Sequence, residues 1–192
     1  MMLRSFIAIE LPTEIQQAIS RSTASLQKVL PRPLVRWVAS LNVHLTLKFL
    51  GDVSPANLER LAETLRLEVI TYPAFTMSVN KLGAFPNPRR PRVFWIGLEA
   101  PPTLLALQRG VEAVVARMGY PLEDRPFSPH LTIGRVSQNA TAAELQKIRT
   151  ALEGATVGML GIVQVNAIQI FKSDLQPSGP VYTPMYTLPL KS

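Results

Sequence analysis

His44-Leu45-Thr46-Leu47 recurs further along the chain as His130-Leu131-Thr132-Ile133, and these two tetrapeptides contain both histidines of the sequence. In each of them polar and apolar residues alternate, which is the pattern of a half-buried β-strand. Because successive side chains of a strand point to opposite faces, each histidine shares a face with the threonine two residues later. Each strand therefore offers one titratable ring and one hydroxyl on the same surface.

The elements around the two tetrapeptides follow the same order twice: strand, helix, histidine strand, helix, strand. His44 and His130 are 86 residues apart, as are Phe75 and Gly161, where the strands that close the two halves begin. Such a repeat predicts two similar lobes related by a pseudo-two-fold axis, with the histidine strands facing each other across a cleft. The alternative is two ordinary strands whose motifs coincide by chance, and the agreement of motif, spacing and order argues against it.

The expected strands and helices are read from hydrophobic periodicity and from cap and turn signals. The expected strands cover 5–11, 35–38, 44–51, 75–85, 92–99, 130–136, 161–171 and 181–190, and the expected helices cover 12–30, 55–69, 101–118 and 141–153. Pro184 interrupts the last strand, so we expect that strand at a sheet edge, in either lobe. We interpret residues 1–192 as a single bilobal domain, with a first repeat of about 1–86 and a second of about 92–192.

The composition limits the class of protein. A chain of 192 residues that is 47% hydrophobic can bury a substantial core, and the absence of cysteine excludes disulfides and thiolate chemistry. The net charge of +7 favours a polyanionic partner such as nucleic acid. The apolar run near the N-terminus is too short for a signal peptide, and no stretch is long enough to span a bilayer. We expect a cytoplasmic monomer that does not bind membranes.

Two histidines on either side of one phosphorus atom can divide the work of phosphodiester cleavage. A neutral ring takes a proton from the attacking oxygen, and a protonated ring gives one to the leaving oxygen. The threonine hydroxyls then donate hydrogen bonds to the non-bridging phosphoryl oxygens. A His-x-Thr motif supplies no second metal ligand and the chain has no Walker-type loop, so we expect no metal and no cofactor.

The motifs HLTLKFLG (44–51) and HLTIGRV (130–136) resemble the paired His-x-Thr-x motifs of the two-histidine phosphoesterase superfamily. They are most similar to those of the LigT-like RNA 2′,3′-cyclic phosphodiesterases, also described as 2′-5′ RNA ligases. The likeness extends through FIAIELP (6–12), RWV (36–38), LGAFPNPRRPRVFW (82–95) and RPFSPHLT (125–132). The fold that it implies is bilobal α+β, in which each lobe is an antiparallel sheet backed by helices and the active site lies between the lobes.

The resemblance implies metal-independent opening of a terminal 2′,3′-cyclic phosphate on RNA, tRNA fragments among the candidates, to a 2′-phosphomonoester. It leaves reversible 2′-5′ RNA ligation open as a second activity. It assigns His44 as the acid that protonates the leaving 3′ oxygen, His130 as the base that activates water, and Thr46 and Thr132 as phosphate contacts. The two motifs are nearly symmetric, so the sequence alone does not decide which histidine is the acid.

Further substrate contacts are expected next to the motifs. Strict alternation places Lys48 on the cleft face, where it either reaches a phosphate or extends to solvent. Alternation turns Phe49 and Arg135 toward the core, but an unpaired buried arginine is too costly. We infer that the second strand bends near Gly134, so that Arg135 reaches a phosphate; Phe49 is either a core residue or, by equivalence, stacks on a nucleobase. Arg125 is a further candidate phosphate contact.

Two other functions fit the same residues. The first is a phosphoesterase for small cyclic nucleotides or ADP-ribose cyclic phosphate, and the second is an RNA-binding module with little turnover. The net charge of +7 suits a polymer better than a single small phosphate. A module that only binds has no need of titratable rings, so the two histidines favour an enzyme.

Overall fold

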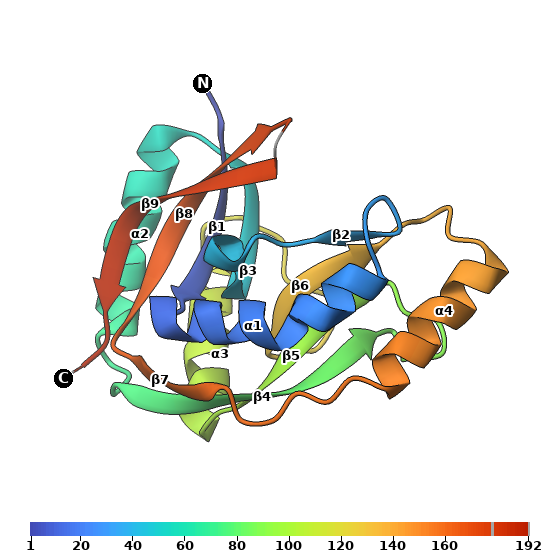
Figure 1. Ribbon diagram of the computed structural model, residues 1–192. Helices are drawn as coiled ribbons and strands as arrows, with labels where there is room; N and C mark the ends of the chain where they lie inside the picture. The colour runs from blue at the N-terminus through green and yellow to red at the C-terminus, as the bar shows by residue number, and fades with distance from the viewer. Residues whose placement is uncertain (178, 192) are drawn as a thin grey trace.

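The computed structural model describes residues 1–177 and 179–191 (Figure 1). Over these residues the chain forms nine strands, four α-helices and one short 3₁₀ helix. In chain order the elements are β1 (Leu3–Glu10), α1 (Thr13–Val29), β2 (Val35–Trp37), η1 (Ser40–Asn42), β3 (His44–Val53), α2 (Pro55–Val69), β4 (Phe75–Phe85), β5 (Val93–Glu99), α3 (Pro102–Arg117), β6 (His130–Val136), α4 (Ala142–Glu153), β7 (Gly161–Val165), β8 (Ala167–Gln176) and β9 (Gly179–Pro189).

The named strands form one antiparallel sheet in the order β7-β4-β5-β6-β3-β1-β8-β9, with β2 added beside β6. At its centre β3 and β6 meet in a single residue pair, Leu45 opposite Leu131, and then diverge. We call β3-β1-β8-β9 the first half-sheet and β6-β5-β4-β7 with β2 the second half-sheet. The expected α+β fold, with antiparallel sheet backed by helices, is confirmed.

Each half-sheet combines strands from both halves of the sequence. The C-terminal strands β8 and β9 complete the half-sheet that contains β1 and β3, whereas β2 and β4 pair with strands of the later sequence. The helices also pack across the two halves of the sequence. α2 packs against α3, and α1 packs against β7 and α4 (Figure 1). The last strand thus lies in the first half-sheet, as the edge strand that the interruption by Pro184 predicts.

The expected single strand over 161–171 is wrong, because the segment divides into β7 and β8. β7 pairs with β4 of the second half-sheet, and β8 pairs with β1 of the first. The buried positions shift phase at the break: Val163 and Val165 are buried before it, and Ile168 and Ile170 after it. One strand with a strict period of two cannot bury both pairs on one face, so the chain turns at Asn166 and crosses between the half-sheets.

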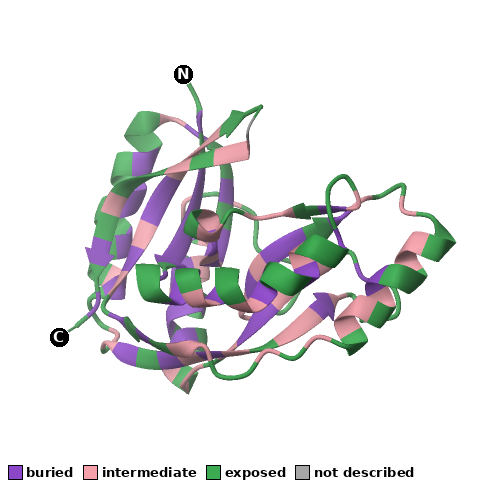
Figure 2. Cartoon of the chain, viewed as in Figure 1, coloured by how far each residue is buried: buried purple, intermediate pink, exposed green. Residues whose placement is uncertain are grey.

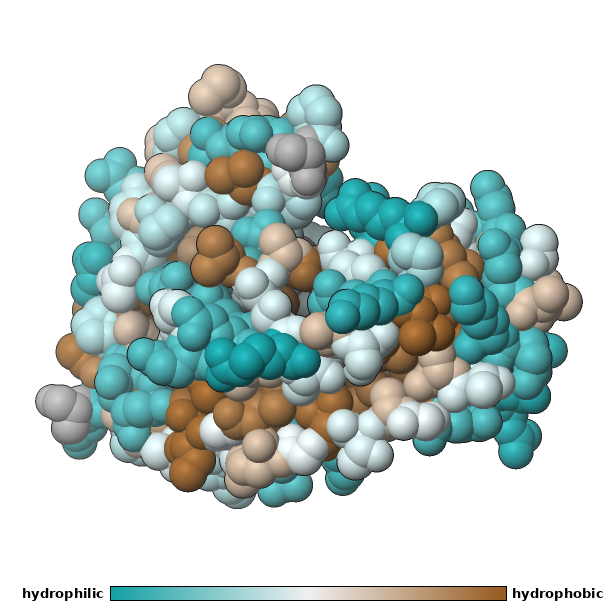
Figure 3. Space-filling view, in the orientation of Figure 1, coloured by the Kyte–Doolittle hydropathy of each residue, from teal (hydrophilic) through white to brown (hydrophobic). Residues whose placement is uncertain are grey.

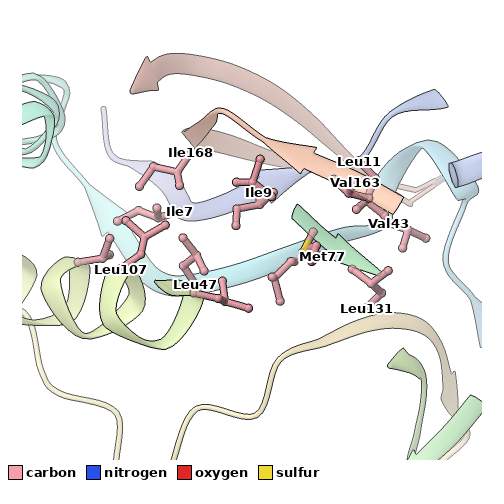
Figure 4. Packing of buried hydrophobic residues seen from close by; sticks show 14 of the residues in the cluster. Ile7, Ile9, Leu11, Val43, Leu47, Met77, Leu107, Leu131, Val163 and Ile168 are labelled. Carbon is pink, nitrogen blue, oxygen red and sulfur yellow. The ribbon is translucent and has the colours of Figure 1, made fainter. Parts of the chain in front are cut away.

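One hydrophobic core extends beneath both half-sheets. Leu45 and Leu131 are 1% and 0% exposed, and they belong to the same cluster as Ile7 of β1 and Leu107 of α3 (Figure 4). Full burial of a leucine contributes roughly 1.5–3 kcal/mol. The burial of these two leucines on the core face therefore stabilises the contact between β3 and β6. The helices are amphipathic, and α1 in particular turns a hydrophilic, exposed face outward (Figures 2 and 3).

Gly161, the first residue of β7, tests how closely α1 packs on the second half-sheet. Its φ is +147°, and a Cβ atom there would lie 2.4 Å from Cδ1 of Ile15 on α1. We expect Gly161→Ala to lower the free energy of unfolding by about 2 kcal/mol, because strain and overpacking combine, and to lower Tm by about 4–8 °C. Gly158→Ala is the matched control, since a Cβ there meets nothing within 4 Å. Equal melting temperatures for the two variants would contradict the close packing.

Candidate active site

The two histidines and two threonines of the motifs lie on one face of the sheet, where the half-sheets meet. We call His44, Thr46, His130 and Thr132 the His–Thr quartet. Leu45 is opposite Leu131 in antiparallel register, and both leucines point to the core. On the opposite face of the sheet, His44 is therefore nearest to Thr132, and Thr46 is nearest to His130. The quartet therefore has a local two-fold arrangement, with one histidine and one threonine from each half-sheet.

Both imidazole rings are oriented by the same backbone contact. Nδ1 of His44 lies 2.8 Å from the carbonyl oxygen of Asn42, and Nδ1 of His130 lies 2.7 Å from the carbonyl oxygen of Ser128. A carbonyl oxygen can only accept a hydrogen bond, so Nδ1 carries the proton in both rings. Nε2 is left to accept a proton when the ring is neutral and to donate one when it is charged.

His44 lies in an aromatic setting that belongs to the first half-sheet. Its ring stacks on Phe6 at a centroid distance of 4.7 Å and meets the edge of Tyr182 at 5.2 Å. Burial lowers the pKa of His44 below its ordinary value, although the hydrogen bond to Asn42 opposes the shift. The side chain of Asn42 donates to the carbonyl of Pro180 at 2.8 Å, so the residue that orients His44 is itself anchored to β9.

The setting of His130 is different. The ring meets the edge of Phe85 at a centroid distance of 4.9 Å, and Trp95 is the residue opposite Thr132 in the sheet. The indole of Trp95 lies over Gly83, where a Cβ atom would come within 2.2 Å of the ring. Glycine at this position therefore leaves the room that the indole needs beside Thr132.

A bulge follows the threonine in each histidine strand. In β3, Thr46 is opposite Ala8 and Lys48 is opposite Ile7, the next residue back, so Leu47 is the extra residue. An extra residue exchanges the two faces of a strand for the residues after it. Lys48 is consequently turned to the core face and Phe49 to the face of the quartet, where Phe49 is 61% exposed.

The second bulge has the same register. Thr132 is opposite Trp95 and Gly134 is opposite Phe94, which makes Ile133 the extra residue. Arg135 is thereby exposed on the face of the quartet. The structure thus places the two residues of the equivalent positions, Phe49 and Arg135, on either side of the quartet.

The expectation that Lys48 faces the cleft is wrong. Its side chain is 2% exposed, and Nζ lies 2.7 Å from Oε1 of Glu112 on α3 and 2.7 Å from the carbonyl oxygen of Pro121. Nζ also lies 3.7 Å from Oε1 of Glu123, in the loop that leads to His130. Alternation failed here because the bulge at Leu47 reverses the faces. Lys48 is a buried ion-pair partner that joins β3 to α3 and to this loop.

Arg125 lies in the loop between α3 and β6, where its side chain is exposed. Within the described residues it forms no ion pair and no hydrogen bond to the quartet. A role for Arg125 in binding phosphate stays a prediction.

Three residues around His44 were not anticipated from the sequence: Phe6, Asn42 and Tyr182. In β1 the odd positions, Ile7 and Ile9, face the main core, and the even positions, Phe6 and Ala8, form a second apolar face. Both faces are apolar in the sequence FIAIE, which is the signal that could have identified Phe6. No local signal identifies Tyr182, because it reaches His44 only through the pairing of β9 with β8.

Two absences within residues 1–177 and 179–191 bear on the class of site. No group of three or more His, Cys, Asp or Glu side chains that could hold a metal ion lies in this part of the chain. None of its helices is long and apolar enough to cross a membrane.

Comparison with known proteins identifies the family. The chain matches the family described as LigT like Phosphoesterase twice, over residues 9–95 and 96–182. It is 35% identical to the RNA 2′,3′-cyclic phosphodiesterase of Methanothermobacter thermautotrophicus over 96% of this chain and 97% of that protein. It is 37% identical to the protein of that name from Escherichia coli, over 71% of this chain and 74% of that one.

The solved structures agree with these matches. The crystal structure of E. coli LigT complexed with 3′-AMP superimposes with a TM-score of 0.77 and 29% identity, and each chain is covered completely. A duplicated α+β fold with a His-x-Thr motif at the start of each central strand places the chain among the two-histidine proteins. More narrowly, the chain belongs to the LigT-like phosphoesterase family.

Lys48→Met tests the buried ion pair. Removing the ammonium leaves the carboxylate of Glu112, whose side chain is 14% exposed, without its partner, so we expect a loss of about 3 kcal/mol in the free energy of unfolding by urea. The double variant Lys48→Met/Glu112→Leu should recover part of the loss, because no charge is left buried. Lys172→Met, which breaks the partly exposed pair with Asp174 (side chains 27% and 43% exposed), should cost less than about 1 kcal/mol. Equal losses for Lys48→Met and Lys172→Met would contradict the assignment.

Proposed function

We propose that this protein is an RNA 2′,3′-cyclic phosphodiesterase, which hydrolyses a terminal cyclic phosphate to a 2′-phosphomonoester. The observation that carries the proposal is the His–Thr quartet, in which both rings are held through Nδ1 and keep Nε2 for proton transfer. The relatives that bear this name match nearly the whole chain, which supports the same activity here.

The reaction is an in-line displacement at phosphorus. The oxygen of a water molecule forms the new bond to phosphorus while the bond from phosphorus to the 3′ oxygen breaks. In keeping with the family resemblance, Nε2 of His130 takes the proton from water and Nε2 of His44 gives a proton to the 3′ oxygen. The products are a 2′-phosphate and a free 3′-hydroxyl. Each imidazole ends in the protonation state in which the other began.

Thr46 and Thr132 donate hydrogen bonds to the non-bridging oxygens, which gain charge in the transition state. Arg135 adds a charge-assisted contact to the same phosphate. Phe49 offers an exposed ring on which the terminal base can stack, while Phe6 beneath it is buried. The quartet face thus combines a proton-transfer pair with groups that hold the phosphate and the base.

The low pKa of His44 is compatible with its role as the acid. A bound cyclic phosphate carries a negative charge, and a nearby negative charge raises the pKa of an imidazole. His44 therefore holds its proton more firmly in the complex than in the free protein. Because burial in the aromatic setting disfavours the charged ring, His44 is also a stronger proton donor than an exposed histidine.

The second candidate is a phosphoesterase for small nucleotides. The structures of E. coli LigT complexed with 3′-AMP and with NADP⁺ concern that relative, and they motivate a direct comparison of substrates here. The net charge of +7 favours RNA. By reversibility, attack of a 5′-hydroxyl in place of water would make a 2′-5′ linkage from the same cyclic phosphate. A cytoplasmic, monomeric protein stays our expectation.

The direct test is incubation of the protein with an RNA oligomer that ends in 2′,3′-cyclic phosphate, in the presence of EDTA. We expect conversion to an oligomer with a 2′-phosphate, located by enzymatic digestion and mass spectrometry. His44→Ala and His130→Ala should each lower kcat by at least about 10²-fold, because each removes one proton-transfer group. A 3′-phosphate product, a metal requirement or near-normal turnover in either variant would overturn the proposal.

A further inference from the structure

Arg36 of β2 lies directly opposite Arg135 of β6. The register of this pairing is Val35 with Val136, Arg36 with Arg135 and Trp37 with Gly134. Residues directly opposite each other in a sheet point to the same face, so Arg36 shares the face of Arg135 and the quartet. Both arginines are exposed, whereas Val35 and Val136 are buried on the opposite face.

Arg36 also lies beyond the point at which β3 diverges from β6. β3 leaves the edge of β6 after Leu45 has paired with Leu131, and the segment from Val38 back to Val35 takes its place along the same edge. The hydrogen bond from the amide of Val38 to the carbonyl of Ile133, 2.9 Å long, marks the start of this second contact. Arg36 therefore lies further out along β6 than Thr132, on the edge of β6 from which β3 has diverged.

This pair of arginines is electrostatically unfavourable for the free protein. Like charges directly opposite in a sheet repel each other, and neither guanidinium forms an ion pair with a carboxylate in the described part of the chain. A third arginine, Arg4, lies on the same face of β1 as Phe6, but it is opposite Asp52 of β3. Two adjacent arginines without a carboxylate partner, on the face of the quartet, indicate an anionic ligand longer than one phosphate.

We propose that Arg36 binds a backbone phosphate of the RNA substrate, on the 5′ side of the terminal nucleotide, while Arg135 contacts the reacting phosphate. The inference rests on the proposed function and narrows it, because a mononucleotide with a cyclic phosphate has no such second phosphate. A guanidinium suits this role, since its planar fork of donors matches two phosphate oxygens at once. Arg36 is thus a substrate-binding residue that distinguishes RNA ends from free cyclic nucleotides.

The test compares two substrates that share the reacting group. One is an RNA oligomer that ends in 2′,3′-cyclic phosphate, and the other is the nucleoside 2′,3′-cyclic monophosphate with the same terminal base. We expect Arg36→Gln to lower kcat/KM for the oligomer by about tenfold, as the loss of one charged hydrogen-bonding group predicts, and to leave the mononucleotide within about twofold. Arg36→Lys should lie between wild type and Arg36→Gln. Arg60→Gln on α2 removes the same charge from a helix outside the sheet and should change neither value.

Two further measurements separate binding from a structural role. The affinity for an oligomer that ends in 2′-phosphate, measured by fluorescence anisotropy, should fall in Arg36→Gln, and the slope of log Kd against log salt should decrease by about 0.7. Tm should be unchanged or raised, because the substitution relieves the repulsion from Arg135. A structural role would instead lower Tm and turnover of both substrates together.

The outcomes are distinct for the two levels of the hypothesis. Equal losses on oligomer and mononucleotide, or no loss on the oligomer and no change in affinity, would overturn the role of Arg36 while leaving the phosphodiesterase intact. A wild-type protein that turns over neither substrate would overturn the proposed function. In that case the anisotropy titration still decides whether Arg36 binds RNA phosphate.

Discussion

The single pairing of Leu45 with Leu131 is the constraint on which the site depends. It is the one residue pair through which β3 joins β6, and both leucines are buried in the core that the half-sheets share. Because the side-chain period of a strand is two, anchoring the leucines on one face fixes the His–Thr quartet on the other. A shift of one residue in either strand would bury a histidine and expose a leucine. The register that buries the two leucines in the core therefore also positions the His–Thr quartet on the opposite face of the sheet.

The local sequence predicted the start of each histidine strand but not the bulge in its middle. Alternation from His44 to Leu47 is correct, and it fails at Lys48 because a bulge is invisible to a period of two. For Arg135 the cost of burying an unpaired charge predicted the orientation of the side chain better than alternation did. Alternation turns Arg135 toward the core, whereas the structure exposes it. For Lys48 the same cost is met by Glu112, a partner 64 positions away that no local pattern identifies.

The sequence also did not predict which strands pair over long distances in the chain. The repeat predicted the order of elements, yet the strands of the two halves are exchanged between the half-sheets, and the aromatic setting of His44 depends on that exchange. Phe6 and Tyr182 come from opposite ends of the chain and meet at one ring. The two motifs are nearly identical in sequence, but the rings occupy different surroundings: Phe6 and Tyr182 contact His44, and Phe85 contacts His130. This difference distinguishes the two histidines physically.

We infer that both histidine rings donate a hydrogen bond from Nδ1 to the backbone and keep Nε2 for proton transfer. Nitrogen NMR tests this inference directly, because the chain contains only two histidines and hence four ring nitrogens. With ¹⁵N-labelled histidine, long-range proton–nitrogen spectra report which nitrogen of each neutral ring is protonated. We predict Nδ1–H in both rings, a pKa below about 6.5 for His44, and a shift of both Nε2 signals when an RNA oligomer with a 2′-phosphate is added. A neutral Nε2–H ring at either position, or Nε2 signals that ignore the bound phosphate, would contradict this arrangement.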